Sequence, residues 1–186
     1  GPFVVLAIVL IVLAALFAAF NLPKILEDEE DKGGSYRRAL KSKHLMFGAL
    51  GIFVYVGAEV TIGSYLVNYF LSLDIEALVA SSPVMTSLAS YLSTIFSDVR
   101  VDNMTAAQLA GTYVFFYWGG AMIGRFIGAG LMQKLNAGNL LALYGIVNIG
   151  LISASILSGG LTAMWTLLAV GLFNSIMFPT IFTLAI

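Results

Sequence analysis

Long apolar runs separated by polar segments dominate this sequence. Five of them cover residues 3–20, 45–73, 106–133, 140–158 and 161–186. A helix needs about 20 apolar residues to cross the hydrocarbon core of a bilayer, and each run reaches or approaches this length. The first run ends at Asn21-Leu22-Pro23, which is typical of a helix end. The pattern predicts an all-α protein, a polytopic membrane bundle of five spanning helices.

Charged residues are few and clustered, which agrees with this interpretation. Only 10% of the 186 residues are charged and 60% are hydrophobic, whereas about a quarter of a soluble domain is charged. Eleven charges lie between Lys24 and Lys43, and six of them are Lys or Arg. The three later connections contain one, one and no Lys or Arg. The positive-inside rule therefore places residues 24–43 in the cytoplasm, with residue 1 outside and residue 186 inside.

The composition also excludes several classes of protein. A net charge of -1 offers no basic surface for nucleic acid, and the lack of cysteine removes thiolate chemistry. The one histidine, His44, follows Lys41 and Lys43 at the edge of an apolar run, where an interfacial anchor is expected. We therefore expect no enzyme, no cofactor and no metal site. The chain begins with Gly1-Pro2 and ends inside an apolar run, so we expect a piece of a longer membrane protein.

The connection between the second and third runs contains an uncharged, amphipathic segment. At about 100° per residue, its apolar side chains fall on one arc and its Ser and Thr side chains on the opposite one. We expect a surface helix at about residues 82–97, with Ser82 as N-cap and Pro83 as first residue. It would pack across the outer mouth of the bundle, as a fixed lid or as a moving gate. The apolar arc contains Leu78, Val84, Met85, Leu88, Ala89, Leu92, Ile95 and Phe96.

Glu59 is the first of two ionisable residues inside the predicted spans. It lies 15 residues from both His44 and Asp74, so at about 1.5 Å per residue it falls near the bilayer midplane. A charged group at this depth is costly, and such residues are functional candidates. Two polar faces are expected along this helix, one with Tyr55, Glu59, Tyr65 and Tyr69 and another with Thr61, Ser64 and Asn68.

A span with two polar faces is expected to line a wet cavity on one of them. In that cavity Glu59 would bind a substrate or a coupling ion, with Tyr55, Tyr65 and Asn68 as further candidates. The alternative is a protonated Glu59 that forms a hydrogen bond between helices.

Further candidates lie in the later spans. Arg125 is nine residues before Lys134, about 13 Å from the cytoplasmic end of its helix, and Trp118 lies on the same face. An Arg and an aromatic ring beside a cavity suit sugar hydroxyls and ring stacking, although a snorkelling Arg and a core Trp are equally ordinary. Asn148 and Asn174 are neutral and at mid-depth, able to hydrogen-bond a substrate or a neighbouring helix.

Glycine and proline mark packing features of the third and fifth spans. Gly120, Gly124 and Gly128 recur at intervals of four and form a narrow stripe. Small residues at this spacing let two helices approach closely in lipid, so the stripe is expected to face another helix. Pro179 is expected to bend the fifth helix close to its inner end.

Three segments carry a resemblance to a known family. They are YVGAEVTIGSYLVNY at residues 55–69, YWGGAMIGRFIG at 117–128 and GLFNSIMFPTIF at 171–182. Together they resemble the fucose:proton symporter family of the major facilitator superfamily, and within it the bacterial glucose/galactose transporter branch. The fucose branch has no acid at the position of Glu59, which favours the glucose/galactose branch.

The resemblance implies twelve helices in two halves of six, of which this chain would supply helices 6 to 10. Residues 1–22 would form the last helix of the first half, 23–43 the cytoplasmic linker, and 44–186 an incomplete second half. It further implies uptake of a hexose or related sugar by alternating access in the bacterial inner membrane. The partners would be the sugar, a proton or sodium ion, the lipid bilayer and the missing parts of the same protein.

Two other functions stay open from the sequence. An efflux antiporter for apolar compounds would share the fold, but its cavity would be more apolar than one lined by Tyr, Glu, Asn and Trp. A non-transporting membrane scaffold would need no carboxylate at the midplane, so Glu59 counts against it.

Overall fold

The computed structural model describes residues 2–19, 40–96 and 99–186, and these residues form helices and turns without any strand. The chain divides into two units, residues 1–39 and 40–186, and each is described by itself. In the first unit α1 covers Pro2–Ala19, the first predicted span, and its 18 residues extend over about 27 Å. Residues 23–39 of the predicted linker lie outside the described residues.

The second unit is a bundle of long helices. α3 (Lys43–Ser72), α6 (Ala106–Met132) and α7 (Ala137–Leu157) are continuous, whereas the last apolar run forms α8 (Gly160–Asn174) and then α9 (Met177–Ala185). Each of α3, α6 and α7 is long and apolar enough to cross a membrane, and so is the segment that α8 and α9 form together. The predicted all-α, polytopic membrane bundle is confirmed, with four such segments among the described residues where five were predicted; the described apolar part of α1, Phe3–Leu16, is shorter.

Polar side chains define where several helices begin. Thr105 and Gln108 form a reciprocal capping box at the start of α6. Asn136 caps α7 by accepting a hydrogen bond from the Gly138 amide at 2.9 Å. Asp74 has a left-handed backbone with φ of 56°, which Asp tolerates better than most residues, and it caps the helix that follows α3. These side chains satisfy amides that have no partner inside a helix.

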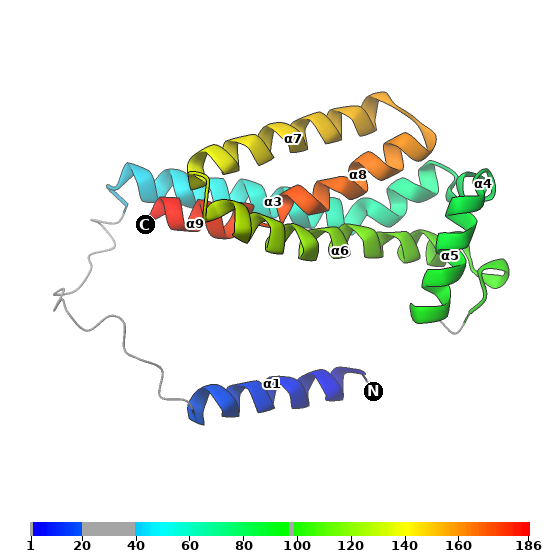
Figure 1. Ribbon diagram of the computed structural model, residues 1–186, viewed down its shortest axis with the longest axis horizontal. Helices are drawn as coiled ribbons and strands as arrows, with labels where there is room; N and C mark the ends of the chain where they lie inside the picture. The colour runs from blue at the N-terminus through cyan, green and yellow to red at the C-terminus, as the bar shows by residue number, and fades with distance from the viewer. Residues whose placement is uncertain (1, 20–39, 97–98) are drawn as a thin grey trace. The chain divides into compact units, whose positions relative to one another are not determined.

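The helix α8 lies at the centre of the bundle. α6 packs along one side of it and α7 along another, while α3 packs against α6 and against α9 (Figure 1). The main core lies where α3, α6 and α8 meet, and Phe70, Tyr113, Tyr117, Met164 and Leu168 are almost fully buried there. The last span therefore changes neighbours along its length, from α6 and α7 at α8 to α3 and α7 at α9.

The break between α8 and α9 corrects the prediction of a bend near the inner end of the fifth span. The chain leaves the helix at Ser175 and Ile176, about midway along the segment Gly160–Ala185. Pro179 has no amide to donate to the Ser175 carbonyl four residues earlier, and its ring would clash there, so the helix ends before the proline. Pro179 is the third residue of α9, where an amide would lack a helical partner anyway.

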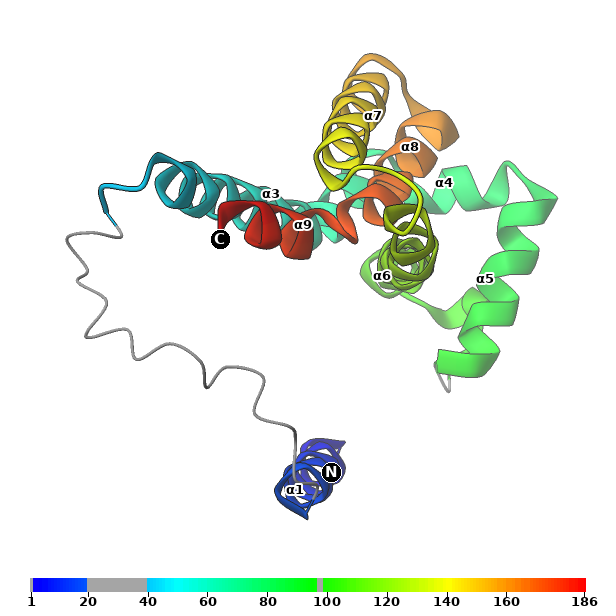
Figure 2. The ribbon, with the colours of Figure 1, turned by 60° about the vertical axis from the view of Figure 1, so that its left-hand side comes forward.

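A crosswise helix closes one end of the bundle. α4 (Ile75–Ala80) and α5 (Pro83–Phe96) follow α3, and a 3-10 turn at Val101–Asn103 precedes α6. α5 lies across the ends of the long helices (Figures 1 and 2), and the Tyr113 hydroxyl of α6 donates to the Met85 carbonyl at 2.7 Å. The predicted surface helix is confirmed up to its last residue, 97, which lies outside the described residues.

The buried side of α5 is narrower than the predicted apolar arc. Met85, Ala89 and Leu92 are buried, but Val84 and Ile95 are 67% and 53% exposed. α5 contacts α4 and α6 along one line, and Val84 lies about 100° around the helix from Met85. Apolar side chains on that flank of α5 therefore point away from the rest of this unit. The side chain of residue 96 lies outside the described residues.

The predicted glycine stripe faces the end of α8 and the break after it. A Cβ atom at Gly124 would overlap the Leu172 carbonyl oxygen, and one at Gly128 would overlap the Ile176 side chain. At Gly120 it would lie 3.5 Å from the Leu172 amide nitrogen, an ordinary contact. The prediction that the stripe packs against another helix is confirmed, and Gly124 and Gly128 are the two positions without room for a side chain.

Candidate functional site

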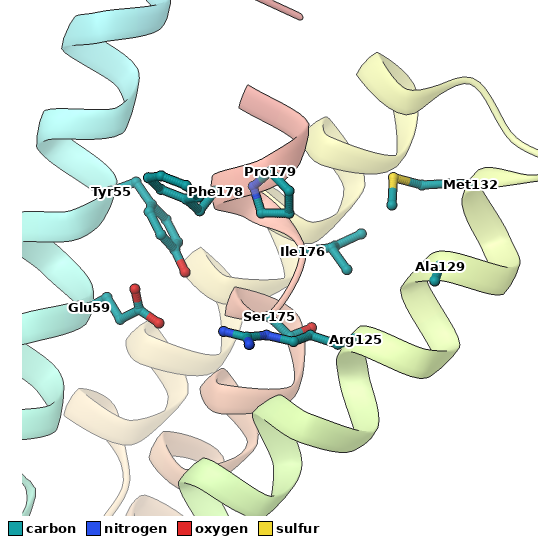
Figure 3. A pocket seen from close by; sticks show the side chains of 9 residues that line it. All are labelled: Tyr55, Glu59, Arg125, Ala129, Met132, Ser175, Ile176, Phe178 and Pro179. Atoms are coloured by element: carbon teal, nitrogen blue, oxygen red, sulfur yellow. The ribbon is translucent and has the colours of Figure 1, made fainter. Parts of the chain in front are cut away.

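A cavity of about 460 Å³ lies where α3, α6 and the break meet. Glu59 reaches into it from α3 and Arg125 from α6, and the two side chains extend toward each other (Figure 3). The hydroxyl group of Tyr55 points into the same space. The lining residues are Tyr55, Glu59, Arg125, Ala129, Met132, Ser175, Ile176, Phe178 and Pro179.

The two charged side chains lie at different distances from the ends of their helices. Glu59 is 16 residues after the start of α3 and 13 before its end, as expected for the membrane midplane. Arg125 is seven residues before the end of α6, or about 10 Å along the helix axis. Within residues 40–96 and 99–186, no ion pair of 4.0 Å or less joins Glu59 to Arg125. A ligand with several hydroxyl groups could therefore contact both side chains.

Tyr55 connects this cavity to the break in the last span. Its hydroxyl donates a hydrogen bond to the Asn174 carbonyl at 2.8 Å, and the Ser175 hydroxyl donates to the Leu172 carbonyl at 2.8 Å. Carbonyls at the end of a helix inside a membrane need donors other than amides of the next turn, and these two hydroxyls supply them. The wall of the cavity is thus formed partly by backbone that has left the helix.

The two predicted asparagines form a hydrogen-bonded pair between helices. The Asn148 amide donates to the Asn174 side-chain oxygen at 2.8 Å, and the Asn174 amide donates to the Tyr117 hydroxyl at 3.2 Å. Both asparagines are buried, and they line an apolar groove of about 580 Å³ between α3, α7 and α9 rather than the Glu59 cavity. Of the two roles considered for them, this arrangement corresponds to the contact with a neighbouring helix.

A second cavity, of about 410 Å³, lies on another side of Glu59. Trp118 covers it from α6, and Gly63 lies so close to the indole that a Cβ atom there would be 3.3 Å from Cζ2. Glu59 therefore belongs to two cavities, one with Arg125 and one with Trp118. The second cavity is lined by Glu59, Val60, Gly63, Ser64 and Trp118.

Two of the predicted site residues lie elsewhere. Tyr65 is 64% exposed and lines neither cavity that contains Glu59. Six residues at about 100° each turn it about 120° away from Glu59, so the prediction that they share a face is wrong. Asn68 is also exposed and lines neither cavity. Tyr69 points to α7, where its hydroxyl donates to the Ser155 carbonyl at 3.1 Å.

Sequence reasoning missed two residues that organise the site. Tyr117 accepts the Asn174 hydrogen bond. Tyr113 and Tyr117 are four residues apart and Tyr117 is three before Gly120, so they continue the stripe on the same side of α6, a signal that could have placed them in the helix contact. Gly63 was missed because a single glycine in an apolar helix has no distinctive pattern, and its importance depends on which ring lies opposite.

Comparison with known proteins finds relatives named as sugar transporters. The chain is 41% identical over 189 residues to a glucose/galactose transporter of Brucella abortus, with 100% of this chain and 39% of the relative covered. A putative glucose/galactose transporter of Helicobacter pylori is 40% identical over 184 residues, covering 99% of this chain and 38% of the relative. The L-fucose-proton symporter of Escherichia coli is 28% identical over 191 residues, covering 100% and 37%.

The chain spans about two fifths of the length of these curated relatives. No protein-family model and no solved structure matches it. The relatives are transporters by name and not enzymes, as expected from the sequence. The predicted family resemblance is confirmed as homology: over its whole length this multi-pass membrane chain is related to proteins named glucose/galactose transporter and, at lower identity, to the L-fucose-proton symporter.

Proposed function

We propose that the full-length protein takes up a hexose or related sugar across the bacterial inner membrane by alternating access, driven by a proton or sodium gradient. The observation that carries this proposal is Glu59, a carboxylate at the midpoint of a membrane helix that lines a cavity with Arg125 and Tyr55. The names of the relatives support the substrate class. An efflux antiporter for apolar compounds fits less well, because a carboxylate, a guanidinium and a phenol line this cavity.

In this proposal Glu59 holds the coupling ion. An ionised carboxylate at mid-depth is costly, and a bound proton or sodium ion neutralises it. When the ion leaves, the Arg125 guanidinium across the cavity compensates the negative charge. Arg125 belongs to α6, which packs against α8, and Tyr55, one turn before Glu59 on α3, donates to the Asn174 carbonyl, so a change of charge at Glu59 acts beside the break in the last span.

The rest of the transporter lies outside this chain. We propose that residues 1–22 end the first six-helix half, that 23–43 link the halves in the cytoplasm, and that 44–186 form an incomplete second half. In such transporters the substrate site lies near the midplane at the interface of the repeats, which fits the depth of Glu59. Residues 1–186 alone are therefore not expected to transport.

A counterflow assay on the full-length protein tests the proposal. Proteoliposomes loaded with unlabelled hexose should exchange it for external radiolabelled glucose or galactose, and liposomes without protein or with residues 1–186 alone should not. If the full-length protein exchanged no hexose but expelled apolar compounds, the efflux alternative would replace it. If it did neither, the transport proposal would fail.

A further inference from the structure

We propose that the sugar ring binds on the Trp118 side of Glu59, stacked on the indole, and that Gly63 is a positioning residue that lets the indole lie there. This inference rests on the proposed function and divides its site into two parts. The cavity with Arg125 serves the coupling ion, and the cavity with Trp118 serves the sugar. Glu59 belongs to both cavities, so one carboxylate contacts both ligands.

The linings of the two cavities differ in the way this division requires. On one side Arg125 opposes Glu59, which suits a carboxylate that binds and releases a coupling ion. On the other side Glu59 is the one charged group among the lining residues, and the rest are Val60, Gly63, Ser64 and Trp118. A sugar is uncharged, with apolar C–H faces and polar hydroxyl edges. An aromatic surface with a few polar groups at its margin is the kind of pocket that binds such a molecule.

The indole of Trp118 has fixed neighbours and is still partly exposed. Its Cζ2 and Cη2 atoms lie beside Gly63 of α3, and it is nearly perpendicular to the Tyr117 ring, at a centroid distance of 5.2 Å and an interplanar angle of 87°. Its side chain nevertheless remains 53% exposed. An indole with fixed neighbours and about half of its surface exposed can receive a ligand in a defined orientation.

Polar groups flank this surface. Among the residues that the structure describes, none forms a hydrogen bond with the Ser64 hydroxyl, although Thr61 on the same helix donates to the Gly57 carbonyl at 2.7 Å. The Ser64 hydroxyl can donate to or accept from a sugar hydroxyl, and the Glu59 carboxylate can accept from one. The cavity thus offers a ring surface with hydrogen-bonding groups on its margin.

Gly63 is the position that fixes the indole. A Cβ atom there would lie 3.3 Å from Cζ2 and 3.8 Å from Cη2, so the first atom of any side chain already moves the ring by a few tenths of an ångström. A branched side chain moves it further. Gly57 lies six residues earlier on α3. No packing neighbour lies within 4 Å of a Cβ atom built at Gly57, so this residue provides a matched control.

The test is a double-mutant cycle in the full-length protein, measured as the hexose concentration that half-saturates counterflow. Trp118→Leu removes the stacking surface, and Gly63→Val displaces it. Loss of a ring contact corresponds to about a 2- to 10-fold loss of affinity, so each variant should raise the half-saturating concentration by this factor. Gly57→Val should leave it unchanged. In Trp118→Leu, adding Gly63→Val should have no further effect, because the ring that it displaces is gone.

Wild-type half-saturation in Trp118→Leu would overturn the inference. Independent, multiplicative effects of the two substitutions would overturn it as well, since Gly63 would then act on something other than the ring. If Gly63→Val does not fold, Gly63→Ala against Gly57→Ala gives the same cycle with a smaller displacement. In all of these outcomes the wild-type protein still exchanges hexose. Loss of the proposed function would instead appear as no hexose counterflow in the wild type.

Discussion

The contact at Gly124 gives the most quantitative prediction about this fold. In Gly124→Ala the new methyl group would overlap the Leu172 carbonyl oxygen and lie 2.5 Å from the Ser175 hydroxyl oxygen. The carbonyl belongs to the backbone of α8, so a side-chain rotation cannot relieve the overlap, and α6 and α8 must separate. Overpacking of this kind costs about 1–3 kcal/mol.

The same methyl group also disturbs a hydrogen bond. The Ser175 hydroxyl donates to the Leu172 carbonyl at 2.8 Å, and loss of this bond adds about 0.5–1.5 kcal/mol. Alanine returns up to about 1 kcal/mol through its higher helix propensity. Gly124→Ala should therefore lower the free energy of unfolding by a net of about 0.5–4.5 kcal/mol. Gly124→Leu should destabilise further and reduce expression.

Gly130 of the same helix is the control, because no atom lies within 4 Å of its Cβ position. Gly130→Ala should be neutral or stabilise the protein by up to about 1 kcal/mol. The assay is thermal unfolding of the full-length variants in one detergent, followed by size-exclusion chromatography of the heated samples. If Gly124→Ala proved as stable as Gly130→Ala, the close approach of α6 and α8 would be refuted.

Two further predictions concern hydrogen bonds between helices. Tyr113→Phe removes the donor to the Met85 carbonyl, so amide exchange in α5 should accelerate while α7 stays protected. Equal protection of α5 in both proteins would show that this hydrogen bond does not hold α5 on α6. Asn174→Leu removes its bonds to Asn148 and Tyr117, whereas Asn148→Leu removes the one to Asn174 and a weak contact of 3.4 Å with the Met177 sulfur. At about 0.6 kcal/mol for each such bond in a membrane, Asn174→Leu should unfold at the lower temperature, and the reverse order would count against the network.

The spans were predictable because each depends on the hydrophobicity summed over some 20 residues, and this sum is large whichever helices pack beside the span. The amphipathic helix at Pro83–Phe96 was predictable for a related reason, since its pattern repeats over several turns. The position of the break was not predicted correctly. A proline determines which helical hydrogen bond is lost, but it does not determine where the chain leaves the helix. Its position before Pro179 also depends on Tyr55 and Ser175, whose hydroxyls satisfy the carbonyls released there.

The candidate site was predictable in part. Glu59 and Arg125 stand out because charge is rare inside spans, and the structure brings them to one cavity. The error at Tyr65 arose within one helix, where the sequence itself fixes the angle and the turn of about 120° was overlooked. Asn148 and Asn174 could not be separated from substrate-binding residues by sequence, because the choice depends on which polar group the neighbouring helix presents.

The central claim is that Glu59 holds the coupling ion for sugar uptake, and Glu59→Gln in the full-length protein tests it most directly. Glutamine resembles the protonated acid and still accepts hydrogen bonds from a sugar, but it cannot release an ion. Passive hexose counterflow should therefore persist with a similar half-saturating concentration, while accumulation driven by a proton or sodium gradient should be lost. Wild-type accumulation in Glu59→Gln would contradict the claim, and so would an equal loss of exchange and accumulation, which would make Glu59 a sugar-binding residue alone.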